Sequence, residues 1–254
     1  MTDKEKVYNH QLEKEITVKQ SHQHGEATNL YHVATTLKKL DLGSELAKQE
    51  KFSKGLYQLL DELSIVVNES GTITSIANHY NILKKWEKVK RSALDAFKGP
   101  AVVKYLDTIE AKVQDENKLL GDINQYRLLG FLWNGLYRDY SSPVKRQKAH
   151  LQSINYLPLA VDETFTWLDD GTEDANPVYI EFFGEIEETG LSNKKINKFF
   201  RRKGYPSATF QLMQYEGLYE MDTATGWLRK GDFTMLASYG HEYVKSQTIT
   251  IKRL

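Results

Sequence analysis

The sequence predicts an α+β fold, in which strands from the N-terminal and C-terminal parts build one antiparallel sheet and a central three-helix segment packs on it or is inserted into it. Residues 1–77 and 151–254 contain short alternating or β-branched runs separated by polar turns, which is typical of strands. Residues 78–140 repeat apolar side chains every three or four positions, which is typical of helices. We expect a single domain over residues 1–254, because the N-terminal strands look too few for a sheet of their own; the alternative is a split near residues 141–150.

The N-terminal part contains three kinds of strand signal. Residues 15–19 alternate apolar and polar side chains, and residues 30–37 are rich in Thr, Val and Tyr. A β-branched run at residues 65–67 leads into a turn at residues 68–71, whose glycine can adopt the positive φ that a hairpin loop often needs. The strand resumes at residues 72–76, so this region predicts a β-hairpin.

The central part is predicted to be helical. Asn78 is expected to cap a helix that runs to residue 97, and Pro100 starts a second helix that reaches residue 120. Residues 127–137 are apolar almost all round, which predicts a buried helix that is too short to span a bilayer. The expected apolar positions of the first helix are Tyr80, Leu83, Trp86, Val89, Ala93 and Phe97.

The C-terminal part is predicted to consist mostly of strands. Pro158 gives the first of them, at residues 156–161, the character of an edge strand. Residues 194–203 contain six Lys or Arg residues and predict a short basic helix. The other expected strands lie at residues 164–168, 178–187, 209–213, 217–221, 227–228 and 248–251, with a turn at residues 222–226.

The composition excludes several kinds of site. The chain has no Cys, so a disulfide framework, a thiolate metal site and a cysteine nucleophile are impossible. No apolar run is long enough to span a membrane, and the first residues lack the apolar stretch of a signal peptide, so we expect a cytoplasmic protein unless a signal has been removed. Phosphate-binding loops, dinucleotide fingerprints and G-x-S-x-G motifs are absent, and we expect no cofactor.

Residues 151–193 are the most unusual stretch, because they contain ten acidic residues and no Lys or Arg. Aromatic residues lie between the acids, and such a surface suits a basic partner. We therefore predict a non-enzymatic protein-interaction protein (an adaptor, an accessory subunit or an immunity-type inhibitor) whose partner is a protein with a basic surface. The alternative is that this acidic block docks onto residues 194–203 of the same chain. The expected partner-binding residues are Trp167, Asp169, Asp170, Glu173, Asp174, Glu181, Glu185 and Glu187.

Two other functions are open alternatives. The aromatic strands could curl into a half-barrel that binds a small molecule or a lipid. A hydrolase could work through carboxylates or a metal, and Glu181, Glu185 and Glu187 share one side of a predicted strand. This alternation is also the ordinary pattern of a half-buried strand with one wet face, so we predict no catalytic residue.

Ion and nucleic-acid sites receive little support from the sequence. His22 and His24 lie two positions apart, but zinc usually needs three or four ligands, so no metal residue is predicted. The acidic loop at residues 169–174 does not have the ligand spacing of a calcium-binding loop. Residues 194–203 could contact phosphates, yet the acidic block lies just upstream, so we do not expect nucleic-acid binding.

Overall fold

The computed structural model divides the chain into two compact units. The first unit comprises Met1–Asn124 and Trp133–Tyr137, and the second comprises Gln125–Leu132 and Arg138–Leu254. The described residues are 10–23, 28–125, 127–133, 136–137, 140–141, 144–154, 157–168, 177–186 and 193–253.

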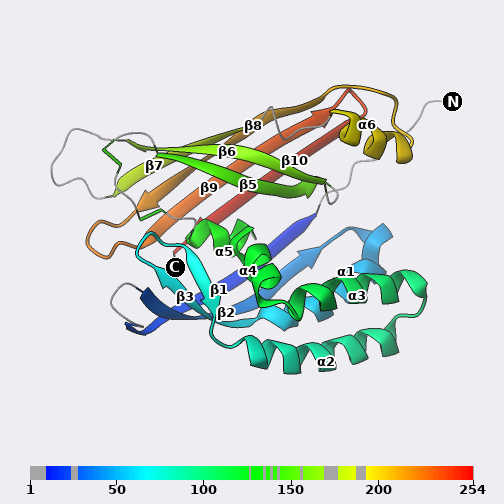
Figure 1. Cartoon of the computed structure of the whole chain (residues 1–254), viewed down its shortest axis with the longest axis horizontal. Helices are drawn as coiled ribbons and strands as arrows, with labels where there is room; N and C mark the ends of the chain where they lie inside the picture. The colour runs from blue at the N-terminus through cyan, green and yellow to red at the C-terminus, as the bar shows by residue number, and fades with distance from the viewer. Residues whose placement is uncertain are drawn as a thin grey trace. The chain divides into compact units, whose positions relative to one another are not determined.

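The predicted α+β class is confirmed, with antiparallel strands in the N-terminal and C-terminal parts and helices between them (Figure 1). The strands from the two parts form two separate sheets, of four and six strands. β1 and β2 contain 13 and 14 residues, which is much longer than the sequence pattern indicated, and this length lets four strands make a sheet of their own. The single-domain organisation stays a prediction.

The first unit combines an antiparallel sheet with helices, some of which lie between its second and third strands while the others follow its last strand. Its sheet has the order β1-β2-β3-β4, in which each strand pairs with the next. The strands are β1 (Gln11–Gln23), β2 (Thr28–Asp41), β3 (Glu62–Asn68) and β4 (Ile73–Ile76). The helices are η1 (Ser44–Leu46), α1 (Ala47–Tyr57), η2 (Gln58–Leu60), α2 (His79–Ala96), α3 (Pro100–Val113) and α4 (Glu116–Gln125).

The predicted hairpin between β3 and β4 is confirmed. Asn68 closes the turn, since its Oδ1 accepts a hydrogen bond of 2.8 Å from the backbone N–H of Thr72. Gly71 has φ 75° and donates its N–H to the carbonyl oxygen of Asn68 at 2.9 Å. A side chain at this glycine would also meet the ring of Tyr137, because an added Cβ would lie 2.5 Å from Cδ2. Glycine is therefore required here both by the backbone and by packing.

Helix α2 follows the hairpin as predicted, and two of its residues differ from expectation. Asn78 precedes the helix, but its side chain does not cap it: Oδ1 accepts from the N–H of Ser64 at 2.8 Å. Tyr80 was expected in the core and is 66% exposed, whereas Ile82 and Trp86 are buried. Residues two positions apart point to nearly opposite sides of a helix, so Tyr80 cannot share the buried stripe of Ile82.

The second unit is an antiparallel meander of six strands with two helices. Its sheet has the order β10-β9-β8-β7-β6-β5. The strands are β5 (Val144–Ile154), β6 (Leu157–Leu168), β7 (Val178–Ile186), β8 (Phe210–Met221), β9 (Leu228–Tyr239) and β10 (Tyr243–Lys252). The helices are α5 (Arg127–Leu132) and α6 (Asn193–Arg202).

Strand β6 is one continuous strand where the sequence predicted two shorter ones, at residues 156–161 and 164–168. Pro158 lies in its first part, where the register records pairs with β5, and the pairing with β7 begins at Val161. Between Val161 and Phe165 β6 pairs on both sides, with β5 and with β7, so the edge-like character expected of residues 156–161 does not extend to the middle of the strand.

One face of the six-stranded sheet carries a layer of buried aromatic side chains, and we call it the inner face. Phe182 and Phe233 stack with their ring centroids 5.9 Å apart, and Phe182 is completely buried. Helix α5 covers this layer with Phe131, whose ring centroid lies 4.6 Å from that of Tyr219. Phe131 also lies against Gly231, where an added Cβ would be 2.3 Å from its ring. The absence of a side chain at Gly231 makes this close approach possible.

Helix α6 packs on the same inner face, at one end of the sheet (Figure 1). Phe200 stacks on Tyr239 with a centroid separation of 4.0 Å, and both rings are buried. Tyr239 belongs to the inner face because it alternates in phase with the buried Phe233 along β9. The hydroxyl of Tyr239 donates to Oδ1 of Asn197, which fixes the helix to the strand.

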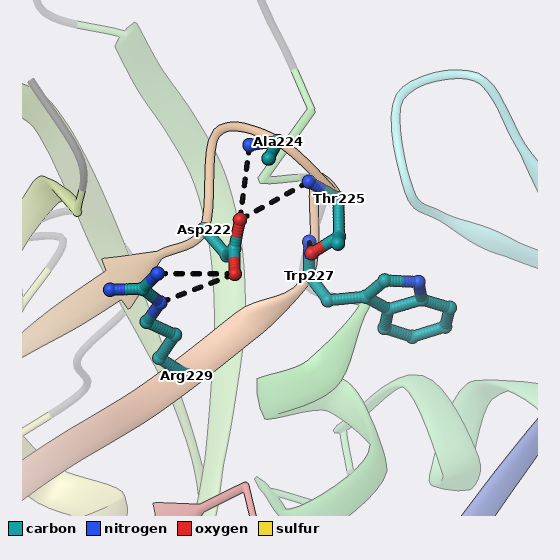
Figure 2. Close-up of polar contacts among 5 residues, drawn as sticks. All are labelled: Asp222, Ala224, Thr225, Trp227 and Arg229. Carbon is teal, nitrogen blue, oxygen red and sulfur yellow. Dashed lines mark hydrogen bonds and ion pairs between the residues drawn. The ribbon is translucent and has the colours of Figure 1, made fainter. Parts of the chain in front are cut away.

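The turn between β8 and β9 holds the register of the central strands (Figure 2). Oδ1 of Asp222 accepts the N–H groups of Ala224 and Thr225 at 3.0 and 3.2 Å. Its Oδ2 accepts from Nη2 of Arg229 at 3.2 Å. Partial burial would raise the pKa of Asp222, but the hydrogen bonds from Thr225 and Arg229 outweigh it and lower the pKa, which keeps the carboxylate charged.

Candidate functional site

The face of the six-stranded sheet opposite the aromatic layer, which we call the outer face, carries apolar and acidic side chains in alternation. On β7, Tyr179, Glu181 and Phe183 point outward, since Ile180 and Phe182 between them are buried on the inner face. These three outward residues pair across the sheet with β8. The register is Tyr179 with Glu220, Glu181 with Leu218, and Phe183 with Glu216.

The six paired residues form a regular pattern in which every apolar side chain faces a carboxylate on the neighbouring strand. Directly opposite residues in an antiparallel sheet have Cβ atoms about 5 Å apart, so the pattern is dense. Phe183 is 45% exposed, Leu218 38% and Tyr179 36%. We call this set the acidic checkerboard: Tyr179, Glu181, Phe183, Glu216, Leu218 and Glu220.

The acids of this face are only partly compensated by neighbouring groups. Within the described part of the chain, neither Glu181 nor its outward neighbour on β7, Glu185, takes part in an ion pair. Glu216 accepts a hydrogen bond of 2.7 Å from Nε2 of Gln214. Asp232, which faces Leu218 from β9, is by contrast paired with Lys230 at 2.5 Å. Negative charge is therefore concentrated on β7 and the adjoining part of β8.

The structure brings together some of the residues expected to bind a partner. Glu181 and Glu185 lie on the outer face, and both are exposed. Trp167 is 38% exposed but occupies an inner-face position, since it pairs with the buried Ile180 and its ring centroid lies 6.0 Å from that of Tyr140. The other expected residues lie outside the described residues: Asp169, Asp170, Glu173, Asp174 and Glu187.

Half of the checkerboard was missed by the sequence reasoning. Glu216, Leu218 and Glu220 follow the acidic block in the chain and lie in a region of net positive charge. Their spacing of two along β8 was visible in the sequence and places them on one face of a strand. What could not be read from the chain was that β8 lies beside β7, because a helix and a loop separate the two strands.

The basic segment lies on the opposite side of the sheet from the checkerboard. Helix α6 packs on the inner face through Ile196 and Phe200, which are 2% and 1% exposed. Its exposed cations therefore do not meet Glu181 and Glu185, which point from the outer face. The sheet thus keeps Glu181 and Glu185 apart from the basic helix of the same molecule.

A buried carboxyl group lies on the inner face and was also missed. Glu163 is 1% exposed and accepts a hydrogen bond at Oε1 from the hydroxyl of Tyr215. The ring of Tyr215 crosses β7 at Gly184, where an added Cβ would lie 2.5 Å from its Cδ1. The glycine therefore lets a tyrosine on β8 reach an acid on β6. This hydrogen bond gives Oε1 of the buried carboxyl group a partner and links β6 to β8 across β7.

The described residues include no group of three or more His, Asp or Glu placed to hold a metal ion. The side chains of His22 and His24 and the acidic loop 169–174 lie outside them. No helix in the described part of the chain is both long and apolar enough to cross a membrane.

Comparison with known protein families, with curated proteins and with solved structures found no match for this chain. We therefore infer the function from the geometry of the two sheets and their exposed side chains.

Proposed function

We propose that this chain is a non-enzymatic protein-interaction protein, such as an adaptor, an accessory subunit or an immunity-type inhibitor, and that its acidic checkerboard binds a basic protein surface. The observation that carries the proposal is the alternation of Phe183, Leu218 and Tyr179 with carboxylates on a solvent-facing sheet. An antiparallel sheet with one wet face normally presents polar side chains there. Three large exposed apolar side chains among acids are better explained by an interaction surface.

The chemistry of the checkerboard matches the side chains of Lys and Arg. These residues have an apolar stem and a cationic end, and they can lay the stem on an apolar surface while the charge meets a carboxylate. Phe183 and Tyr179 also offer aromatic faces to a cation. Glu181 and Glu185, which form no ion pair with a described residue, would speed the approach of a basic partner and select against acidic ones.

The geometry gives less support to the alternatives. A half-barrel that binds a small molecule would use the inner face, where Phe131 packs directly against Gly231 and Tyr219. A hydrolase working through the carboxylates of β7 would need them in a concave, partly desolvated site. Glu181 and Glu185 lie on the exposed face of the sheet instead.

A binding measurement with the full-length chain tests the proposal. The probe is a short labelled peptide rich in Arg and Lys, followed by fluorescence anisotropy, with an acidic peptide of equal length as the negative probe. The double variant Phe183→Ser, Glu181→Gln should bind the basic peptide about fivefold or more weakly, because it removes one apolar contact and one charge. Binding should also weaken with added salt.

A matched control is available on the first unit. Tyr80 is a 66% exposed aromatic residue on α2, and Glu87 is an exposed acid on the same helix. The double variant Tyr80→Ser, Glu87→Gln makes the same chemical changes away from the checkerboard and should leave peptide affinity unchanged. Equal affinity of the wild-type chain and the Phe183, Glu181 variant would disprove the proposal.

A further inference from the structure

The outward side of α6 is basic and exposed. Ile196 and Phe200 turn the helix toward the sheet, while Lys198, Arg201 and Arg202 are exposed. The helix contains no acidic residue. Lys203 follows directly and is also exposed. A single helix thus presents a patch of cations beside an apolar stripe that is already buried.

These cations have little compensation within the described part of the chain. Lys198 and Arg202 form no ion pair with a described residue, and Arg201 donates from Nε to Oγ of Ser207 at 2.8 Å. The checkerboard faces away on the other side of the same sheet, so the two unlike surfaces cannot neutralise each other in one molecule. Between two molecules they can.

The spacing of the charges fits such a contact. Lys198 and Arg202 are one helical turn apart, which separates them by about 6 Å along the helix. Glu181 and Glu216 are diagonal neighbours across β7 and β8, at about 7–8 Å. A helix lying across these strands would therefore set two cations over two carboxylates. The stems of the cationic side chains would then lie over Phe183 and Leu218 between the acids.

We infer that the basic partner of the checkerboard is a second copy of this chain, which docks its α6 helix there. The inference rests on the proposed function and names its partner. The contact joins two different surfaces, so each copy can offer α6 to one neighbour and its checkerboard to another. Association of this kind is head-to-tail, grows with concentration and weakens as salt screens the charges.

The test is sedimentation velocity of the full-length chain over a range of concentrations. The wild-type chain should associate increasingly with concentration at about 0.05 M salt and much less at about 0.5 M salt. A helix-reversed variant, Lys198→Glu with Arg202→Glu, and a sheet-reversed variant, Glu181→Lys with Glu216→Lys, should each self-associate at least about tenfold more weakly. An equimolar mixture of the two should associate again, because each reversed surface meets its complement.

Two controls separate lost contacts from lost structure. Lys88→Glu reverses an exposed charge on α2 and should leave the association unchanged. If a charge-reversed variant fails to fold by circular dichroism, Lys198→Gln with Arg202→Gln removes the same cations without adding acids and should weaken association in the same direction.

The outcomes distinguish the two proposals. A chain that stays monomeric at low salt but binds the Arg- and Lys-rich peptide overturns the second-copy inference and leaves the proposed function standing. Self-association that persists in both reversed variants, or a mixture that does not recover, also overturns the inference. Failure of the wild-type chain to bind the Arg- and Lys-rich peptide overturns the proposed function itself.

Discussion

The two faces of the six-stranded sheet are built from the same strands, yet their aromatic residues occupy opposite environments. Phe182 is completely buried among other rings, while Phe183, the next residue, is 45% exposed. Helices α5 and α6 pack on the first face. In the described part of the chain, the outer face has no corresponding layer over Phe183 and Leu218. The difference shows that identical side chains on neighbouring positions of one strand become core or surface according to what covers them.

The acidic side chains of the two faces also lie in different environments. On the inner face the carboxyl group of Glu163 is buried and held by the hydroxyl of Tyr215. On the outer face Glu181 is exposed and has no ion partner among the described residues. The inner acid is therefore part of the packing, whereas the outer acid is available to a partner. Three predictions test the contrast between the two faces, from the largest expected effect to the smallest.

The first prediction compares neighbouring phenylalanines. Phe182→Ala should lower the free energy of unfolding by about 3–5 kcal/mol, because it leaves a cavity among the rings of Phe165, Tyr219 and Phe233. Phe183→Ala should change it much less, by about 0.5 kcal/mol, since Phe183 is 45% exposed. Urea denaturation of both variants measures the difference. Similar losses in the two variants would mean that the outer face is covered in solution.

The second prediction concerns the glycine that faces Phe182 from β8. At Gly217 an added Cβ would lie 2.2 Å from Cε1 of Phe182 and 2.5 Å from the carbonyl oxygen of Asp232. Gly217→Ala should therefore cost about 1–3 kcal/mol in the free energy of unfolding. Gly121→Ala, on α4, is the control: nothing lies within 4 Å of an added Cβ there. That change should stabilise the helix by about 0.5–1 kcal/mol.

Thermal or urea denaturation of the two alanine variants measures these effects. A Gly217→Ala variant as stable as the wild type would show that the aromatic layer can move away from β8. That result would contradict the tight packing of Phe182 against Gly217.

The third prediction uses pH. Lys245 on β10 has an inner-face position opposite the buried Ala237, and burial lowers the pKa of its ammonium group. Between the lowered folded pKa and the unfolded value of 10.5, the unfolded chain binds more protons, so wild-type stability rises with pH in that window. Lys245→Met lacks this titration. Its stability should exceed that of the wild type near neutral pH, and the gain should shrink as the pH approaches 10.5.

The matched control is Lys252→Met, which replaces an exposed lysine on the outer face of the same strand. Urea denaturation at several pH values should show no pH-dependent gain for this variant. A gain for Lys245→Met that stays constant with pH would contradict the assignment of Lys245 to a desolvated position.

Local patterns in the sequence predicted much of the fold correctly. The turn at Asn68, the helix after Asn78 and the basic helix near residue 200 all depend on short-range signals, and all three are present. Asn78 shows the limit of such signals. It precedes the helix as expected, but the prediction that its side chain caps the helix is wrong, because Oδ1 accepts from Ser64 on β3, a partner that the chain brings close only on folding.

The sequence by itself determined the alternation of β7, the concentration of acid in residues 151–193 and the basic character of α6, because these are properties of neighbouring residues. It also indicated the wet side of β7, since Glu181 and Glu185 share one side of the strand, but it could not say what covers the other side or which strand lies beside β7. Tertiary structure decided both when Phe131 of α5 packed against the inner rings and Gly231, and when β8 paired with β7. The same packing left Phe183, Glu181 and Glu216 on β8 exposed, which is why the surface proposed to bind a partner could be described only in the folded chain.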